Sequence, residues 1–224
     1  MPWGSSGTGR LCFAGYTGGI KAQTGRFHSP RSSETYPSGL CVYYDHSQLV
    51  KLEGSSLALV GVVMGSDSDL KLMGATMQVL EEFAVAYEVV ISSAHRAPVQ
   101  TAQYAASAAE RGLEVIIAAA GAAAHLPGVI AASTPLPVIG VPVKSGALSG
   151  VDALYAIVQM PSGVPVATVG IDGAKNAALL ACQILSVKYP ELRDKIIEYK
   201  QKLNQQVASK NQQLQAKGWR GYAE

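Results

Sequence analysis

From residue 57 onward, apolar runs of strand length alternate with segments in which apolar residues recur at helical spacing. The runs lie at 57–64, 87–91, 115–117, 137–141 and 164–171. The helical segments lie at about 70–83, 99–111, 151–160 and 175–187, with a further short helix after His125. Strands that alternate with helices predict βαβ units and a parallel sheet, and consecutive apolar positions predict helices on both faces. We therefore expect a three-layer α/β/α sandwich with five parallel strands.

The tail that follows, from about 189 to 217, is rich in lysine and glutamine and predicts one long extending helix. Its apolar positions form only a sparse stripe: Leu192, Ile196, Ile197, Tyr199, Leu203, Val207 and Leu214. A helix this polar either lies across a neighbouring subunit or is a solvated terminal helix. We favour the first interpretation.

Residues 1–56 show no periodic pattern and are predicted to form an irregular or disordered leader. They carry nine of the 23 glycines and five Lys/Arg against three Asp/Glu. This composition fits disorder or an organelle transit segment, and it lacks the apolar core of a secretory signal. The catalytic domain is therefore expected to span residues 57–224.

Charge and cysteine content exclude several classes of partner. Residues 57–224 carry 13 basic and 13 acidic groups, which argues against nucleic acid or an anionic membrane surface. No apolar run reaches the ~18 residues that a membrane span needs. Cys12, Cys41 and Cys182 show no spacing typical of disulfides or zinc. A cytoplasmic location is expected, or a plastid if the leader is a transit segment.

The strongest candidate chemistry lies at 92–98 (SSAHRAP), between the second apolar run and the next helical segment. In open α/β sheets, ligands bind beyond the carboxyl ends of the strands. There the His95 imidazole can give and take a proton near neutral pH, and the Arg96 guanidinium can hold an anion. Taken alone, His95 is more simply a structural hydrogen bonder and Arg96 a surface ion pair.

Two other strand ends carry matching features. The segment 65–69 (GSDSD) offers hydroxyls and a helix N-terminus that suit a phosphate or sugar, although Ser and Asp there are also ordinary N-caps. The third loop, 118–128, places His125 after several very small residues, which let a ligand approach the backbone. A second histidine in the same crevice favours catalysis over a structural role for both.

Some familiar sites are absent from the sequence. There is no phosphate-binding P-loop, no Gly-x-Gly-x-x-Gly after the first strand and no Gly-x-Ser-x-Gly elbow. Asp67 and Asp69 could ligate magnesium, but no further carboxylate cluster supports a metal site.

Taken together, these loops resemble the class I N5-carboxyaminoimidazole ribonucleotide mutases, whose domain also forms the catalytic subunit of phosphoribosylaminoimidazole carboxylase. The segments that carry the resemblance are 65–69, 93–98, 123–128, 137–143 and 157–161, and the likeness covers about 57–222. It implies a flavodoxin-like fold, a homo-octamer and a C-terminal helix that reaches over neighbouring subunits. It also implies a reaction of purine biosynthesis that needs no metal, ATP or organic cofactor, with an ATP-dependent carboxyaminoimidazole ribonucleotide synthetase as functional partner.

The resemblance also implies the roles of individual residues. His95 would donate and later accept the proton, while His125 would border the carbon dioxide pocket. Binding of the ribonucleotide is expected from Ser66, Ser68, Asp69, Ser93, Arg96, Gly121 and Leu126. Asp69 is expected on a ribose hydroxyl because its charge repels phosphate.

The chain departs from the family pattern mainly at Ala119 and Ala122, where glycine is usual. Alanine is costly at such positions if the backbone needs a positive φ. Smaller departures are Ala97, Ala153 and Ala156. Two other functions therefore stand beside the mutase: a direct carboxylase of aminoimidazole ribonucleotide using carbon dioxide, and a non-catalytic nucleotide-binding homologue.

Overall fold

The structure is a computed structural model that describes residues 58–223, so the leader predicted for 1–56 lies outside the described residues. Five parallel strands form one sheet in the order β2-β1-β3-β4-β5, which is the flavodoxin-like order. The strands are β1 (Val60–Met64), β2 (Tyr87–Ile91), β3 (Val115–Gly121), β4 (Val138–Val143) and β5 (Ala167–Thr168). The sequence prediction of a five-stranded parallel α/β sandwich is thus confirmed.

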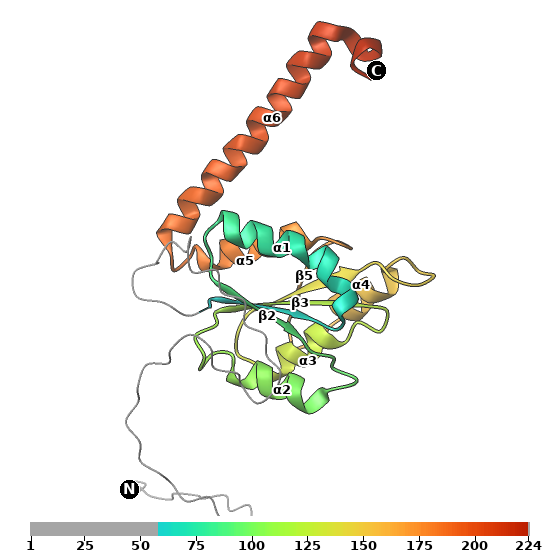
Figure 1. The fold of residues 1–224 in the computed structure, drawn as a ribbon, viewed down its shortest axis with the longest axis vertical. Helices are drawn as coiled ribbons and strands as arrows, with labels where there is room; N and C mark the ends of the chain where they lie inside the picture. The colour runs from blue at the N-terminus through green and yellow to red at the C-terminus, as the bar shows by residue number, and fades with distance from the viewer. Residues whose placement is uncertain (1–57, 224) are drawn as a thin grey trace, which may run out of the picture. The chain divides into compact units, whose positions relative to one another are not determined.

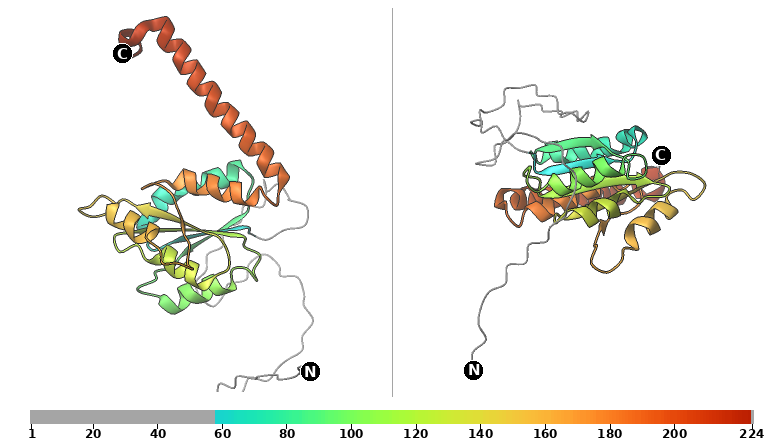
Figure 2. Two further views of the ribbon diagram at one scale, coloured as in Figure 1. Left: turned by 180° about the vertical axis from the view of Figure 1, so that it is seen from behind. Right: turned by 90° about the horizontal axis from the view of Figure 1, so that it is seen from below.

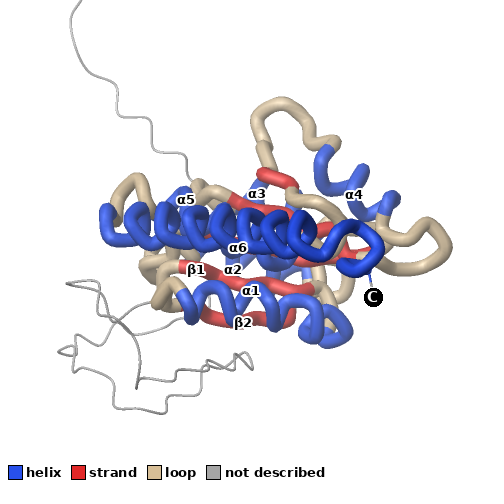
Figure 3. Tube along the Cα trace, turned by 90° about the horizontal axis from the view of Figure 1, so that it is seen from above, coloured by secondary structure: helices blue, strands red, loops and turns tan. Residues whose placement is uncertain are grey.

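Helices cover both faces of the sheet, so the domain has three layers (Figure 1). The helices are η1 (Asp67–Asp69), α1 (Leu70–Glu82), α2 (Pro98–Ser107), α3 (Leu126–Ser133), α4 (Val151–Val158), α5 (Ala174–Leu185) and α6 (Pro190–Ala223). One apolar core joins α1 and α5 to the sheet, and a second joins α2, α3 and α4 to the opposite face. Seen from above, β2 and α4 lie at opposite sides of the domain (Figure 3).

Very small residues allow the layers to approach closely. A Cβ atom on Gly61 of β1 would lie 2.3 Å from the hydroxyl oxygen of Tyr104 in α2. On Gly140 of β4 it would lie 2.3 Å from Cγ2 of Ile157 in α4. Tight packing of this kind leaves no room for a methyl group. The helices are thereby held at fixed positions above the strand ends.

Strand β5 is much shorter than the run 164–171 that was expected to form it. Only Ala167 and Thr168 pair with β4. An edge strand has one neighbour, and its side chains here are exposed or half-buried. Pro165 also lacks the N–H that a longer ladder would require.

Helix α6 begins in the core and then leaves it. Leu192 and Ile196 are buried with α5, whereas almost every residue from 201 to 222 is exposed. The helix extends away from the layers in Figure 1 and in the left view of Figure 2. Its regular part ends at Gly218, where φ is 68° and ψ 164°, close to the end predicted at 217. Among the described residues, none of the helices is long and apolar enough to cross a membrane.

Candidate active site

Loops that follow β1, β2, β3 and β4 meet at one edge of the sheet and line a cavity of about 400 Å³. Parallel pairing brings these four carboxyl ends together, and β1 lies between β2 and β3. The helices that follow β1 and β3 pack on opposite faces, so a crevice opens between them. The lining residues are Gly65, Ser66, Ser68, Asp69, Ser93, Ala94, His95, Arg96, Ala120, Gly121, Ala122, Ala123, Leu126 and Ser145.

His95 and His125 contact each other directly across this crevice. The Nε2 atom of His95 lies 2.9 Å from the Nδ1 atom of His125, and the two rings are nearly perpendicular at 79°. One imidazole must therefore donate and the other accept, which couples their tautomers. His95 lines the cavity, whereas His125 is not among the lining residues and lies at the N-terminus of α3. The contact engages Nε2 of His95 and orients its ring, so Nδ1 of His95 is left to meet a ligand.

Arg96 provides the positive charge of the cavity. Its Nη2 atom donates to the carbonyl oxygen of Gly65 at 3.1 Å, and its Nε atom donates to the Ser93 hydroxyl at 3.4 Å. Ser93 also accepts a hydrogen bond from the backbone N–H of Arg96. These contacts hold the guanidinium beside the first loop while leaving it exposed to an anion. An oxygen-rich ligand such as a phosphate suits it.

The first loop combines capping with polar lining. Ser66 caps η1 by accepting a hydrogen bond from the N–H of Ser68 at 3.3 Å, so the N-cap interpretation of this serine is correct. Asp69 is buried, and burial raises the pKa of its carboxyl above the ordinary value even though the Ser68 hydroxyl donates to it at 3.2 Å. A buried carboxylate with one such donor retains free acceptor sites, which suit ligand hydroxyls.

The third loop is held by Ser145, which the sequence interpretation missed. The Ser145 hydroxyl accepts a hydrogen bond from the N–H of Ala122 at 2.8 Å. Gly121 is required beside it, because a Cβ atom there would lie 2.8 Å from that hydroxyl oxygen. Ser145 is a single serine in a loop of small residues, and it belongs to no sequence motif. Its position after β4 was the only sign that it would lie at this edge of the sheet.

The two unusual alanines differ in backbone conformation. Ala122 has a φ of 50°, in the left-handed region. Ala119 lies inside β3 opposite Met64 and Val141, is fully buried, and has no positive φ. The expected strain is therefore present at Ala122 and absent at Ala119.

All nine residues expected to form the site lie at this edge, eight in the cavity lining and His125 in contact with His95. Within residues 58–223, no three His, Cys, Asp or Glu side chains are grouped as metal ligands would be. One cation, several hydroxyls, a buried carboxylate and an imidazole face a pocket of the size of a small phosphorylated molecule. Small residues at 120–123 add an apolar wall.

Comparison with known proteins agrees with this geometry. The AIR carboxylase family model matches residues 59–206. An N5-carboxyaminoimidazole ribonucleotide mutase from Pyrococcus horikoshii is 58% identical over 168 residues, which cover 75% of this chain and 95% of that protein. The protein of the same name from Thermotoga maritima is 56% identical over 163 residues and covered to 95%. Phosphoribosylaminoimidazole carboxylase from Schizosaccharomyces pombe is 53% identical over 165 residues, which are 74% of this chain and 30% of that protein.

A solved structure shares this fold. PurE from Treponema denticola superposes with a TM-score of 0.64 at 30% identity, covering 70% of this chain and 98% of that one. The family model includes all five strands and all four site loops. The chain therefore belongs to the AIR carboxylase family.

Proposed function

We propose that this chain is an N5-carboxyaminoimidazole ribonucleotide mutase that acts in purine biosynthesis. The observation that carries the proposal is the His95 imidazole, which faces the cavity and is oriented by His125 at 2.9 Å. Relatives that bear this name are 56–58% identical over nearly their whole length. A proton carrier beside an anion clamp is what such an isomerisation needs.

The reaction begins when the carbamate C–N bond of the substrate breaks and carbon dioxide is released. The exocyclic nitrogen then takes a proton from His95. The ring carbon next forms a bond to the trapped carbon dioxide and loses its own proton back to His95. The proton and the carboxyl group are both conserved, so the imidazole ends in its starting state. Confinement of carbon dioxide by the small residues at 120–123 raises its effective concentration.

The remaining lining residues fit the two ends of the ribonucleotide. Arg96, Ser93 and Ser66 would hold the phosphate, because a guanidinium and hydroxyls offer donors to its oxygens. Asp69 would accept hydrogen bonds from ribose hydroxyls. Ser68 would support Asp69 through the contact described above.

The test is isomerisation of the ribonucleotide carbamate by the full-length protein, with aminoimidazole ribonucleotide plus bicarbonate assayed in parallel. We expect turnover of the carbamate without added metal or ATP, and its loss in His95→Asn. Turnover of aminoimidazole ribonucleotide with bicarbonate alone would identify a direct carboxylase. Binding of the ribonucleotide without turnover would identify a non-catalytic homologue and contradict the proposal.

We propose further that the protein assembles into a homo-octamer. Helix α4 and the turn before it expose four large apolar side chains at helical spacing: Leu148, Val151, Tyr155 and Val158. Residues 199–223 carry five Lys/Arg and no Asp/Glu, while 58–198 carry twelve Asp/Glu and eight Lys/Arg. The α6 helix is therefore complementary in charge to the rest of the domain, which favours its docking on another copy. Light scattering should give about eight times the chain mass of 23.4 kDa, and a monomer would contradict this.

The substrate itself is a carbamate and must be made by a carboxylating enzyme. We propose an ATP-dependent carboxyaminoimidazole ribonucleotide synthetase as the functional partner. A coupled assay with such a synthetase, ATP and bicarbonate should convert aminoimidazole ribonucleotide to the carboxylated product. The mutase alone should give little product from the same mixture.

A further inference from the structure

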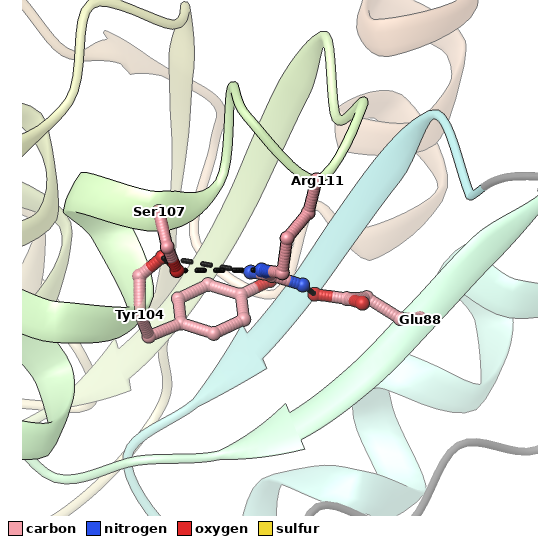
Figure 4. Close-up of polar contacts among 4 residues, drawn as sticks. All are labelled: Glu88, Tyr104, Ser107 and Arg111. Atoms are coloured by element: carbon pink, nitrogen blue, oxygen red, sulfur yellow. Dashed lines mark hydrogen bonds and ion pairs between the residues drawn. The ribbon is translucent and has the colours of Figure 1, made fainter. Parts of the chain in front are cut away.

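Polar side chains link helix α2 to strand β2 at both ends of the helix. Beyond its C-terminal end, Arg111 Nη1 lies 2.6 Å from Oε1 of Glu88 in β2. The same guanidinium stacks over the Tyr104 ring at 4.7 Å and donates to the Ser107 hydroxyl at 3.4 Å (Figure 4). We call this group the distal clamp, because it lies at the end of α2 away from the cavity.

A second and smaller contact lies at the end of α2 that faces the cavity. The hydroxyl oxygens of Ser92, which follows β2, and Thr101, in the first turns of α2, are 2.7 Å apart. Both residues are buried. The Thr101 hydroxyl donates to the carbonyl oxygen of Ala97 at 3.0 Å, so the Ser92 hydroxyl is the donor in their shared bond. We call this pair the proximal clamp.

The proximal clamp is needed because α2 begins without a side-chain cap. Its N-cap is Ala97, which makes no side-chain hydrogen bond to the helix. An uncapped first turn frays more easily than one capped by Ser or Thr. Thr101 links that turn to Ser92, and Ser92 is itself held in the sheet by its N–H bond to the carbonyl of Met64 at 2.8 Å. The hydroxyl pair thus joins the start of the helix to the sheet.

The residues between the two halves of the proximal clamp include His95 and Arg96. We propose that Ser92 and Thr101 are positioning residues that hold the His95 imidazole where it can transfer a proton to bound substrate. The expected effect on kcat rests on the proposed function. The expected effect on the order of residues 93–97 rests on the geometry alone. Because proton transfer needs a close heavy-atom approach, a small shift of the loop lowers the rate more than it lowers binding.

The test is Thr101→Val, which keeps the side-chain volume and removes both hydroxyl contacts. We expect kcat to fall about tenfold, KM to change less than about threefold, and amide exchange at 93–97 to become faster. The matched control is the double variant Glu88→Gln/Arg111→Met, which removes the ion pair of the distal clamp without leaving a buried charge. It should lower the unfolding midpoint while leaving kcat within about twofold of wild type.

A rescue variant separates positioning from general stability. Adding Ala97→Ser to Thr101→Val supplies an N-cap acceptor for the first turn of α2. The kcat should then return toward the wild-type value, and amide exchange at 93–97 should become slow again. Wild-type kcat and exchange in Thr101→Val, or an equal loss of kcat in the distal control, would overturn the inference. If Thr101→Val does not fold, Ser92→Ala is judged by the same criteria. If the wild-type protein has no mutase activity, the proposed function fails, and the exchange measurement alone decides whether the clamp orders the loop.

Discussion

The Nε2 atom of His95 lies 2.9 Å from the Nδ1 atom of His125, although the two residues follow different strands that β1 separates. His95 follows β2 and His125 follows β3, so neither strand pairs with the other. The contact therefore depends on the pairing of β1 with both β2 and β3. It makes the two histidines one unit, with His95 facing the cavity.

Replacement of His95 by Asn should abolish turnover and preserve the structure. The amide can still hydrogen-bond to His125 but cannot carry a proton, so kcat should fall by about a hundredfold or more. Steady-state kinetics measure this effect, with circular dichroism and light scattering as controls for folding and assembly. His125→Asn should lower kcat less, because His125 only orients the proton carrier. Equal losses in both variants would mean that His125 also contacts the substrate.

Ala119 in β3 and Ala122 in the loop after it should respond in opposite ways to substitution by glycine. Ala122 has a φ of 50°, so Ala122→Gly should relieve strain and raise the free energy of unfolding by about 0.5–1 kcal/mol. Ala119→Gly should lower it by about 1 kcal/mol, because Ala119 is buried in a strand. Urea unfolding of both variants provides the comparison. A loss of stability in Ala122→Gly would show that the loop needs its methyl group.

Substitutions at Gly61 and Tyr104 should have strongly non-additive effects on the free energy of unfolding. A methyl group on Gly61 would meet the Tyr104 hydroxyl at 2.3 Å, so Gly61→Ala should destabilise the fold by about 1–3 kcal/mol. Among the described residues, that hydroxyl has no hydrogen-bond partner. Burial and the nearby Glu88 carboxylate raise its pKa well above the ordinary value, so it stays protonated. Tyr104→Phe alone should be nearly neutral.

The double variant Gly61→Ala/Tyr104→Phe should then recover much of the lost stability. A double-mutant cycle from urea unfolding gives the coupling energy between the two sites. Additive effects would mean that the methyl group meets something other than the hydroxyl, such as Leu113, whose Cδ1 atom would lie 3.2 Å away.

Asp69 should make stability depend on pH. Burial raises the pKa of its carboxyl in the folded state, so the folded protein binds more protons than the unfolded chain between the two pKa values. Its contribution to stability therefore falls as the pH rises through that interval. Asp69→Asn should raise the free energy of unfolding at pH 8, because the neutral amide avoids the cost of burying a charge.

The gain from Asp69→Asn should shrink as the pH is lowered toward about 3.9, the ordinary pKa of Asp. Urea unfolding at pH 8 and pH 4.5 measures the difference. A larger gain at pH 4.5 would contradict the sign of the shift. The same variant should raise KM, because Asn cannot replace a carboxylate that accepts hydrogen bonds from ribose hydroxyls.

The pattern of apolar runs was enough to predict the parallel sheet, since central strands such as β1 and β3 are buried on both faces. It overestimated β5, because an apolar run does not reveal that its strand will have a single neighbour. Sequence also placed His95 and His125 at one edge. It could not predict their direct contact, which depends on loop conformation. The same limitation hid Ser145 and the difference between Ala119 and Ala122, since φ is not encoded by residue type alone.

The central position of β1 has a consequence for how the protein is made. During synthesis, β1 leaves the ribosome before β2 and β3, yet it pairs with both and lies between them. Each pairing closes a loop of more than twenty residues, so these contacts form late compared with local helices. A nascent chain that ends before His125 contains only one of the two histidines. The histidine pair thus requires β2, β1 and β3 together, and Ser145 joins the site only when β4 has also paired.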